Sequence, residues 1–197
     1  MLNRTIGVVT LSLVAGTALL ARPQFPDARE ALRLGRSQDE ALYAAFTKGY
    51  SLSPAEPIES AEIITEFRRA VLLVRARAQL GEFGFTERDL TVAMAPHLGL
   101  ITLIAQVRLN PMHTYAAAPA YELYVSTGPE TPPLAGREMK RDPVYALGPM
   151  GSPLIAVRLE ITIPRARIED APRPELIVTD ERAAVMWRSR IELSRFR

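Results

Sequence analysis

Cysteine is absent from this chain of 197 residues, and only two histidines and one tryptophan occur. Without cysteine there is no disulfide framework, thiolate metal site, cysteine nucleophile or lipidated amino-terminal cysteine. Lysine is scarce too, because Lys48 and Lys140 are the only lysines among 24 basic residues. With 22 acidic residues the net charge is +2, well below the positive excess expected of a nucleic-acid-binding protein. We therefore expect no nucleic-acid partner, and arginines used in ion pairs or protein contacts.

Motifs for catalysis, metal binding or nucleotide binding are also missing. His97 and His113 lie in separate loops, and their spacing predicts no shared metal. The glycine-rich stretch 148–153 contains two prolines and leads into a strand, whereas a phosphate loop needs free amides before a helix. The sequence thus predicts no catalytic residue, no metal site and no cofactor, and we expect a protein that is not an enzyme.

The amino-terminal region contains an uncharged apolar run, Thr5 to Ala21, after the single charge of Arg4. This arrangement is typical of a secretory signal. The cleavage site is poor, however, since a cut after Ala21 places Leu19 where a small residue is preferred. The run is also close to the minimum of about 17 residues for a spanning helix. Residues 1–21 are therefore expected to form either a cleaved signal peptide or a retained membrane anchor.

The location follows from the same segment. Basic residues flank the run on both sides, and those that follow it oppose export under the positive-inside rule. They are Arg22, Arg29, Arg33 and Arg36. Short amino-terminal apolar segments on otherwise soluble chains are usually export signals, so we expect an extracytoplasmic protein, periplasmic or secreted, that is anchored in the cytoplasmic membrane if the segment is kept.

Residues 22–98 are expected to form a helical region with connectors. The sequence predicts short helices over 28–34, 39–46 and 86–95, from their caps and flanking glycines or prolines. Apolar residues at helical spacing predict a longer helix over 59–80, with Gly81 at its end.

Residues 99–197 change to a period of two, which is typical of half-buried strands. Five strands are expected, over 101–109, 121–125, 155–163, 176–178 and 185–193. Val185, Trp187, Ile191 and Leu193 are expected to be core residues of the last of these. We therefore predict an α+β chain: a targeting or anchor helix at 1–21, a helical region at 22–98, and an antiparallel β-sandwich of immunoglobulin-like architecture at 99–197.

Two groups of side chains are candidate contact sites. The first is the polar face of the predicted helix 59–80, with Arg68, Arg69, Arg75 and Arg77. These arginines either form a solvated face paired with Glu62 and Glu66, which we favour, or bind anionic lipid headgroups or an acidic partner. The second is the segment 110–124, with Met112, His113, Tyr115, Tyr121 and Tyr124. These side chains form a binding surface or cover the open end of the sandwich.

The favoured functional hypothesis is a non-enzymatic, membrane-associated, extracytoplasmic protein-interaction or structural subunit. One alternative is an accessory subunit of a large membrane complex, such as a respiratory or photosynthetic assembly. Another is a secreted module that binds or hydrolyses carbohydrate or cell-wall polymers. The single tryptophan at an expected core position removes the usual aromatic platform for that role.

Overall fold

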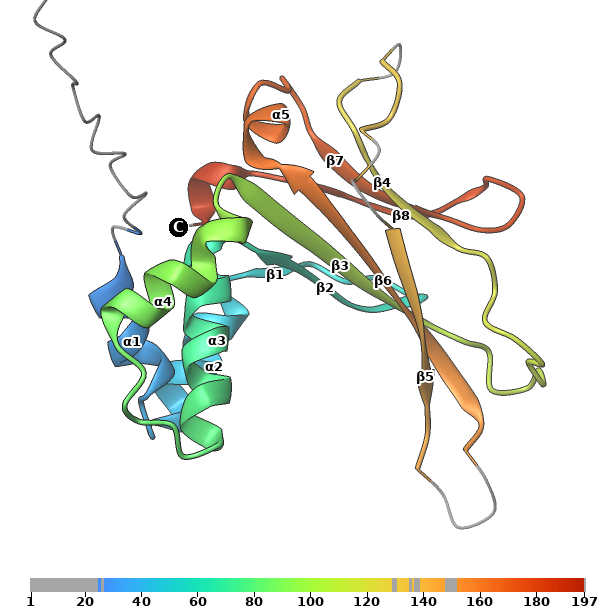
Figure 1. Ribbon diagram of the computed structural model, residues 1–197. Coiled ribbons are helices and arrows are strands. Elements are labelled where there is room, and N and C mark those ends of the chain that lie inside the picture. Colours follow the sequence, from blue (N-terminus) through green and yellow to red (C-terminus); the bar gives the residue numbers. More distant parts are fainter. Residues whose placement is uncertain are drawn as a thin grey trace, which may run out of the picture.

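The computed structural model describes residue 25 and residues 27–128, 131–134, 136, 139–147 and 152–196. The apolar run 5–21 and most of the glycine-rich stretch, residues 148–151, lie outside the described residues. Within the described ranges, no helix is long and apolar enough to cross a membrane. The chain is α+β, with the amino-terminal helices on one side and two antiparallel sheets of five and three strands on the other (Figure 1).

The helices of the amino-terminal half are α1 (Ala28–Gly35), α2 (Glu40–Lys48), α3 (Glu66–Gln79) and α4 (Glu87–Met94), followed by the 3-10 turn η1 (Ala95–His97). Side-chain caps fix three of their starts: Asp39, Thr65 and Thr86 accept backbone N–H groups of α2, α3 and α4. Gly81, with φ of 78°, ends α3, where its N–H and that of Glu82 bond back to the last turn. The predicted helices 28–34, 39–46 and 86–95 are confirmed to within two residues.

The strands form two antiparallel sheets. The first has the order β1-β2-β3-β6-β5, with β1 (Ser51–Leu52), β2 (Ile58–Ile64), β3 (Leu100–Arg108), β6 (Leu154–Pro164) and β5 (Met139–Tyr145). The second has the order β4-β7-β8, with β4 (Glu122–Ser126), β7 (Glu175–Thr179) and β8 (Val185–Arg190). The short helix α5 (Arg165–Glu169) leads from β6 towards β7, and the 3-10 turn η2 (Leu193–Arg195) follows β8.

One hydrophobic core contains side chains from both sheets. Alternate residues of β3 and β6, such as Leu103 and Leu159, contribute to it, and so do Leu123 of β4, Val178 of β7 and Trp187 of β8. This alternation is the period of two in the sequence, so the expected strands 101–109, 121–125, 155–163 and 176–178 are confirmed. β8 covers the first part of the expected strand 185–193.

A second, smaller core lies among the helices. It joins Phe25, the buried faces of α1 and α3, and Leu90 and Met94 of α4. Phe46 of α2 packs against both cores, with its ring centroid 6.0 Å from that of Phe67 and 5.1 Å from that of Tyr50. The helices are therefore joined to the sheets by aromatic packing.

The expectation of one helix over 59–80 is wrong for its first part. Residues 58–64 form β2, which pairs antiparallel with β3, and the helix begins only after Thr65. Ile63 and Ile64 fit a helical stripe, but β-branched residues are also favoured in strands, and pairing with β3 decides the outcome. From the sequence we expected a helical region up to residue 98 and strands only after it. β1 and β2 lie before residue 98, yet they belong to the same sheet as β3.

Two further differences from the sequence prediction, at β5 and at Val185, arise on edge strands of the sheets. β5 carries Lys140, Arg141, Asp142 and Pro143 instead of an apolar alternation, because it is an edge strand that needs no buried face. Val185, expected in the core, is 46% exposed, since it lies at the start of the edge strand β8.

The contact between α1 and α3 gives the first prediction. A Cβ at Gly35 would lie 2.6 Å from Val74 Cβ and 2.8 Å from the carbonyl oxygen of Val71, so Gly35→Ala forces the two helices apart. We expect a loss of about 1–3 kcal/mol in the free energy of unfolding, measured by urea denaturation. Gly84→Ala is the control, because its Cβ meets nothing within 4 Å. Equal stability of the two variants would contradict the packing of α1 on α3.

Candidate functional site

Arg68 does not lie on an exposed arginine face. It is 2% exposed and extends from the first turn of α3 towards β2. Its guanidinium donates to the Glu62 carboxylate and, at 2.8 Å, to the carbonyl oxygen of Ile63, and it lies 5.4 Å from the centre of the Tyr50 ring. Among the described residues, its Nε has no hydrogen-bond partner. Arg68 therefore ties the start of α3 to the strand before it.

Arg69 also points back to the five-stranded sheet. Its guanidinium donates to the hydroxyl of Thr102, which lies 2.9 Å from the hydroxyl of Thr162 on the neighbouring strand. Burial lowers the pKa of Arg69, and the nearby carboxylate of Glu160 partly offsets this effect. Burial, with a smaller contribution from the charge of Arg69, lowers the pKa of His97.

Arg75 and Arg77 are engaged within the helical region. Arg75 lies 3.7 Å from the centre of the Tyr43 ring and forms an ion pair of 2.6 Å with Glu40. Arg77 pairs with Glu82 at 2.7 Å in the turn after α3. All four predicted arginines therefore have partners inside the protein. Glu66, expected to pair with them, accepts the backbone N–H of Gly99.

The segment 110–124 divides between two places. Tyr115 and Tyr121, both half-buried, line one hollow of about 380 Å³, which we call the tyrosine hollow, while Met112 is 87% exposed beside it. Tyr124 lies on β4 opposite Ile177, and alternation along β4 turns it away from the core-facing Leu123. The candidate residues of this segment therefore do not form one surface.

The polar groups of the tyrosine hollow are partly fixed. The Tyr115 hydroxyl accepts the backbone N–H of Asn110 at 3.3 Å. Burial raises the pKa of Tyr121, with further contributions from Tyr115, Glu181 and Asp180. His113 is exposed, and its ring centroid lies 6.2 Å from that of Tyr115.

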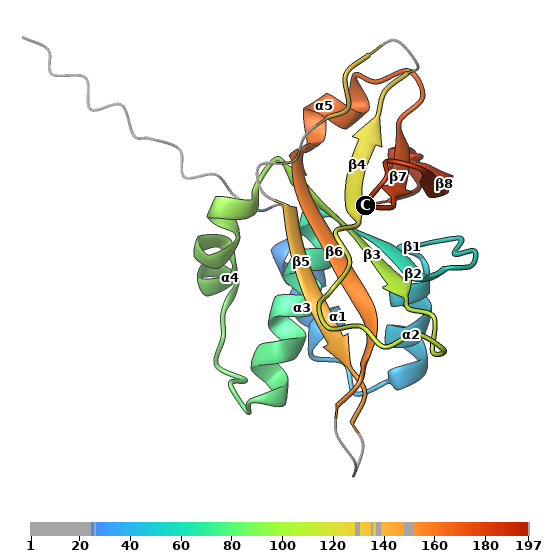
Figure 2. The same cartoon turned by 90° about the vertical axis from the view of Figure 1, so that its right-hand side faces the viewer.

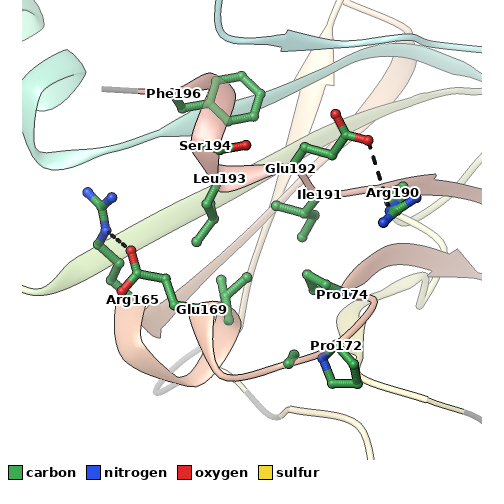
Figure 3. Close-up of a pocket in the computed structure, with 12 residues that line it drawn as sticks. Arg165, Glu169, Pro172, Pro174, Arg190, Ile191, Glu192, Leu193, Ser194 and Phe196 are labelled. Atoms are coloured by element: carbon green, nitrogen blue, oxygen red, sulfur yellow. Dashed lines mark hydrogen bonds and ion pairs between the residues drawn. The ribbon is translucent and has the colours of Figure 1, made fainter.

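A larger hollow of about 640 Å³ lies between α5, the segment 171–174 and the residues after β8; we call it the C-terminal groove (Figure 3). Ion pairs border it, Arg165 with Glu169 at 2.7 Å and Arg190 with Glu192 at 4.0 Å. Apolar side chains lie between these pairs: Ile168, Pro172, Pro174, Ile191, Leu193 and Phe196. Ile168, Ile191 and Phe196 are buried, so the accessible lining of the groove is more polar than apolar.

The chemistry available in the C-terminal groove is limited. Ser194 is the one hydroxyl among its lining residues, which include no histidine, and the carboxylates of Glu169 and Glu192 are each paired with an arginine. In the described part of the chain, no group of three or more His, Asp or Glu side chains is arranged to hold a metal ion.

The C-terminal groove was not predicted from the sequence. Arg165 and Glu169 belong to a five-residue helix directly after β6, and Phe196 follows the last expected strand. The i,i+4 spacing of Arg165 and Glu169 was the one available signal, but such pairs are common on exposed helices.

No family model matches the sequence, and no curated protein or solved structure matches it.

The buried ion pair gives the second prediction. Glu62→Gln removes the charge facing Arg68, whose side chain is 3% exposed, so we expect a loss of about 1.5–3 kcal/mol in the free energy of unfolding. Glu87→Gln is the control, because its partner Arg29 is 90% exposed, and it should cost less than about 1 kcal/mol. Equal losses in urea denaturation would contradict a structural role for the buried pair.

The third prediction concerns His97. Because its pKa is lower in the folded state, the folded protein should lose stability relative to the unfolded chain as pH falls below about 6.5. Titration of the two histidine Cε1 protons by NMR should place the His97 pKa below this value. Arg69→Gln should raise the His97 pKa only partly towards its ordinary value, because burial is the larger cause of the lowering and the charge of Arg69 the smaller. Arg182→Gln, in the turn before β8, should leave it unchanged; a His97 pKa insensitive to Arg69 would contradict the assignment.

Proposed function

We propose that this chain is a non-enzymatic, membrane-associated protein on the extracytoplasmic side, and that it acts as a protein-interaction or structural subunit. In this proposal the apolar run 5–21 is a retained anchor helix. The two sheets pack as a β-sandwich of immunoglobulin-like architecture and provide a rigid docking surface. The helical region connects that surface to the membrane.

The position of Phe25 carries the proposal. It is 5% exposed in the helical core, only four residues after the end of the apolar run at Ala21. Four residues of extended chain span at most about 14 Å, so a retained anchor holds the helices close to the lipid surface. A folded unit this near the bilayer suits a subunit that meets its partner at the membrane.

The C-terminal groove supports the docking role. A partner would cover the exposed Pro172 and the half-buried Leu193, and the paired charges at the border of the groove would set the orientation of that partner. Its ionic groups already neutralise one another, which favours binding over proton transfer.

The alternative of an accessory subunit in a respiratory or photosynthetic complex rests on exposed apolar side chains. Tyr145, Leu147 and Ile155 near the ends of β5 and β6 are 54%, 99% and 42% exposed. The backbone N–H of Leu109 donates to the carbonyl oxygen of Ile155, so Ile155 lies beside the start of the loop that carries Met112. Exposed apolar side chains gathered at one end favour a contact with another subunit.

The secreted carbohydrate-binding or hydrolytic alternative has less support. A stacking platform needs several aromatic rings on one face, whereas Tyr124 lies apart from Tyr115 and Tyr121. Trp187 is 7% exposed in the core between the sheets.

The fourth prediction tests the anchor. The full chain should remain in isolated membranes after a high-salt wash, and mass spectrometry should find residues 1–21 retained. Leu13→Arg, in the middle of the run, should release the chain or block its export, because a central arginine costs about 2.5–3.5 kcal/mol. Leu80→Arg, at a side chain that is 74% exposed, is the matched control and should leave localisation unchanged.

Extraction by salt alone as a free monomer would contradict the proposal, and loss of residues 1–21 would favour a secreted protein. Purification from gently solubilised membranes separates the two membrane roles. A stoichiometric complex is expected for an accessory subunit, and recovery of the chain alone would contradict that alternative.

A further inference from the structure

The outer face of the three-stranded sheet carries a third hollow, of about 450 Å³, which we call the outer hollow. Its lining comes from the end of β4, the segment before β7, and β7 and β8. The lining residues are Ser126, Thr127, Gly128, Pro172, Arg173, Glu175, Ile177 and Arg188. Nothing in the functional proposal above uses this face.

The strand register explains how this hollow is built. Tyr124, Ile177 and Arg188 are direct neighbours across β4, β7 and β8, so they form one row on the outer face. Ile177 is 7% exposed although it points away from the core between the sheets. The apolar side chain of Ile177 therefore lies between the ring of Tyr124 and the guanidinium of Arg188.

The two arginines of the outer hollow have no ion-pair partner among the described residues. Arg173 and Arg188 are both exposed, and neither forms an ion pair with a carboxylate of the described residues. By contrast, the arginines bordering the C-terminal groove are paired. With Glu175 as the one acidic residue in the lining, two guanidiniums over an apolar floor favour a carboxylate attached to an apolar group.

The shape favours an extended ligand. Pro172 lines both the outer hollow and the C-terminal groove, so the two adjoin at the segment before β7. A single small anion would occupy only the part of the outer hollow near Arg173 and Arg188. A peptide in extended conformation can place acidic side chains on them and continue its apolar side chains into the groove.

The location disfavours a lipid surface. Figure 1 shows α1 on one side of the molecule and β4, β7 and β8 on the other, and Figure 2, from the sheet side, has β7 and β8 in front. Phe25, where the anchor would join the fold, belongs to the helical core. A membrane held there would face the helices, not the outer hollow.

We propose that the outer hollow binds an extended acidic segment of a partner protein, with Arg173 and Arg188 pairing with its carboxylates and Ile177 receiving an apolar side chain. This inference rests on the proposed docking function and gives it a site and a class of partner.

The fifth prediction tests this site with the purified full chain in detergent. The probe is a fluorescein-labelled peptide of alternating leucine and glutamate, and binding is measured by fluorescence anisotropy. The double variant R173Q/R188Q should weaken binding by about tenfold or more, since charged hydrogen bonds are lost. A leucine–glutamine peptide should bind the native chain as weakly as the acidic peptide binds this variant.

Two controls separate a site from general attraction. Arg167→Gln, alone and combined with Arg182→Gln to match the charge change, alters exposed arginines that line neither hollow, and should leave the affinity unchanged. The variant R173E/R188E should no longer bind the acidic peptide and should instead bind a leucine–lysine peptide. Thermal melting should show that all variants fold, because the altered side chains are exposed.

Equal weakening by the control arginines would overturn the proposal. So would displacement of the peptide by short-chain phosphatidylglycerol below its micellar concentration, which would assign the arginines to a lipid headgroup. If the peptide does not bind as expected, the membrane retention of the native chain is unaffected. Failure of membrane retention, conversely, leaves peptide binding by the purified chain measurable, so the two proposals fail separately.

Discussion

The turn from β2 into α3 depends on one buried guanidinium. Arg68 leaves the first turn of α3 and bonds back to the Glu62 carboxylate and to the carbonyl oxygen of Ile63, while Thr65 caps the helix between them. A buried charge is costly unless it is paired, so this arrangement holds only when strand and helix meet at this angle. Because β2 is also paired with β3, the orientation of α3 is fixed relative to the whole sheet.

The same corner joins the two cores. Tyr50 lies against Arg68, Phe46 and Phe196, and Phe46 packs on both the helical core and the core that contains residues of both sheets. The end of the chain is thus held at the place where helices and sheets meet. Phe196 also lines the C-terminal groove, so the packing that joins the cores shapes one of the candidate binding surfaces.

Arginines therefore have two distinct uses in this protein. Those of α3 have internal partners, and they position elements rather than meet solvent or lipid. Those of the outer hollow are exposed, and among the described residues they have no acidic partner. Sequence spacing cannot separate the two groups, because whether a guanidinium is paired depends on carboxylates and carbonyl groups that only folding brings near it.

The elements controlled by interactions between neighbouring residues could be predicted from the sequence. The cap at Thr86, the stop at Gly81 and the alternation along β3 and β6 each act within a few residues, so they can be predicted without knowledge of the fold. The other elements depend on contacts between residues that are distant in the sequence. Ile63 and Ile64 fit a helix until β3 pairs with them, the charged β5 is a strand only beside β6, and the lining of each hollow comes from segments distant in sequence. Pairing and burial are properties of the assembled chain, and a one-dimensional pattern does not contain them.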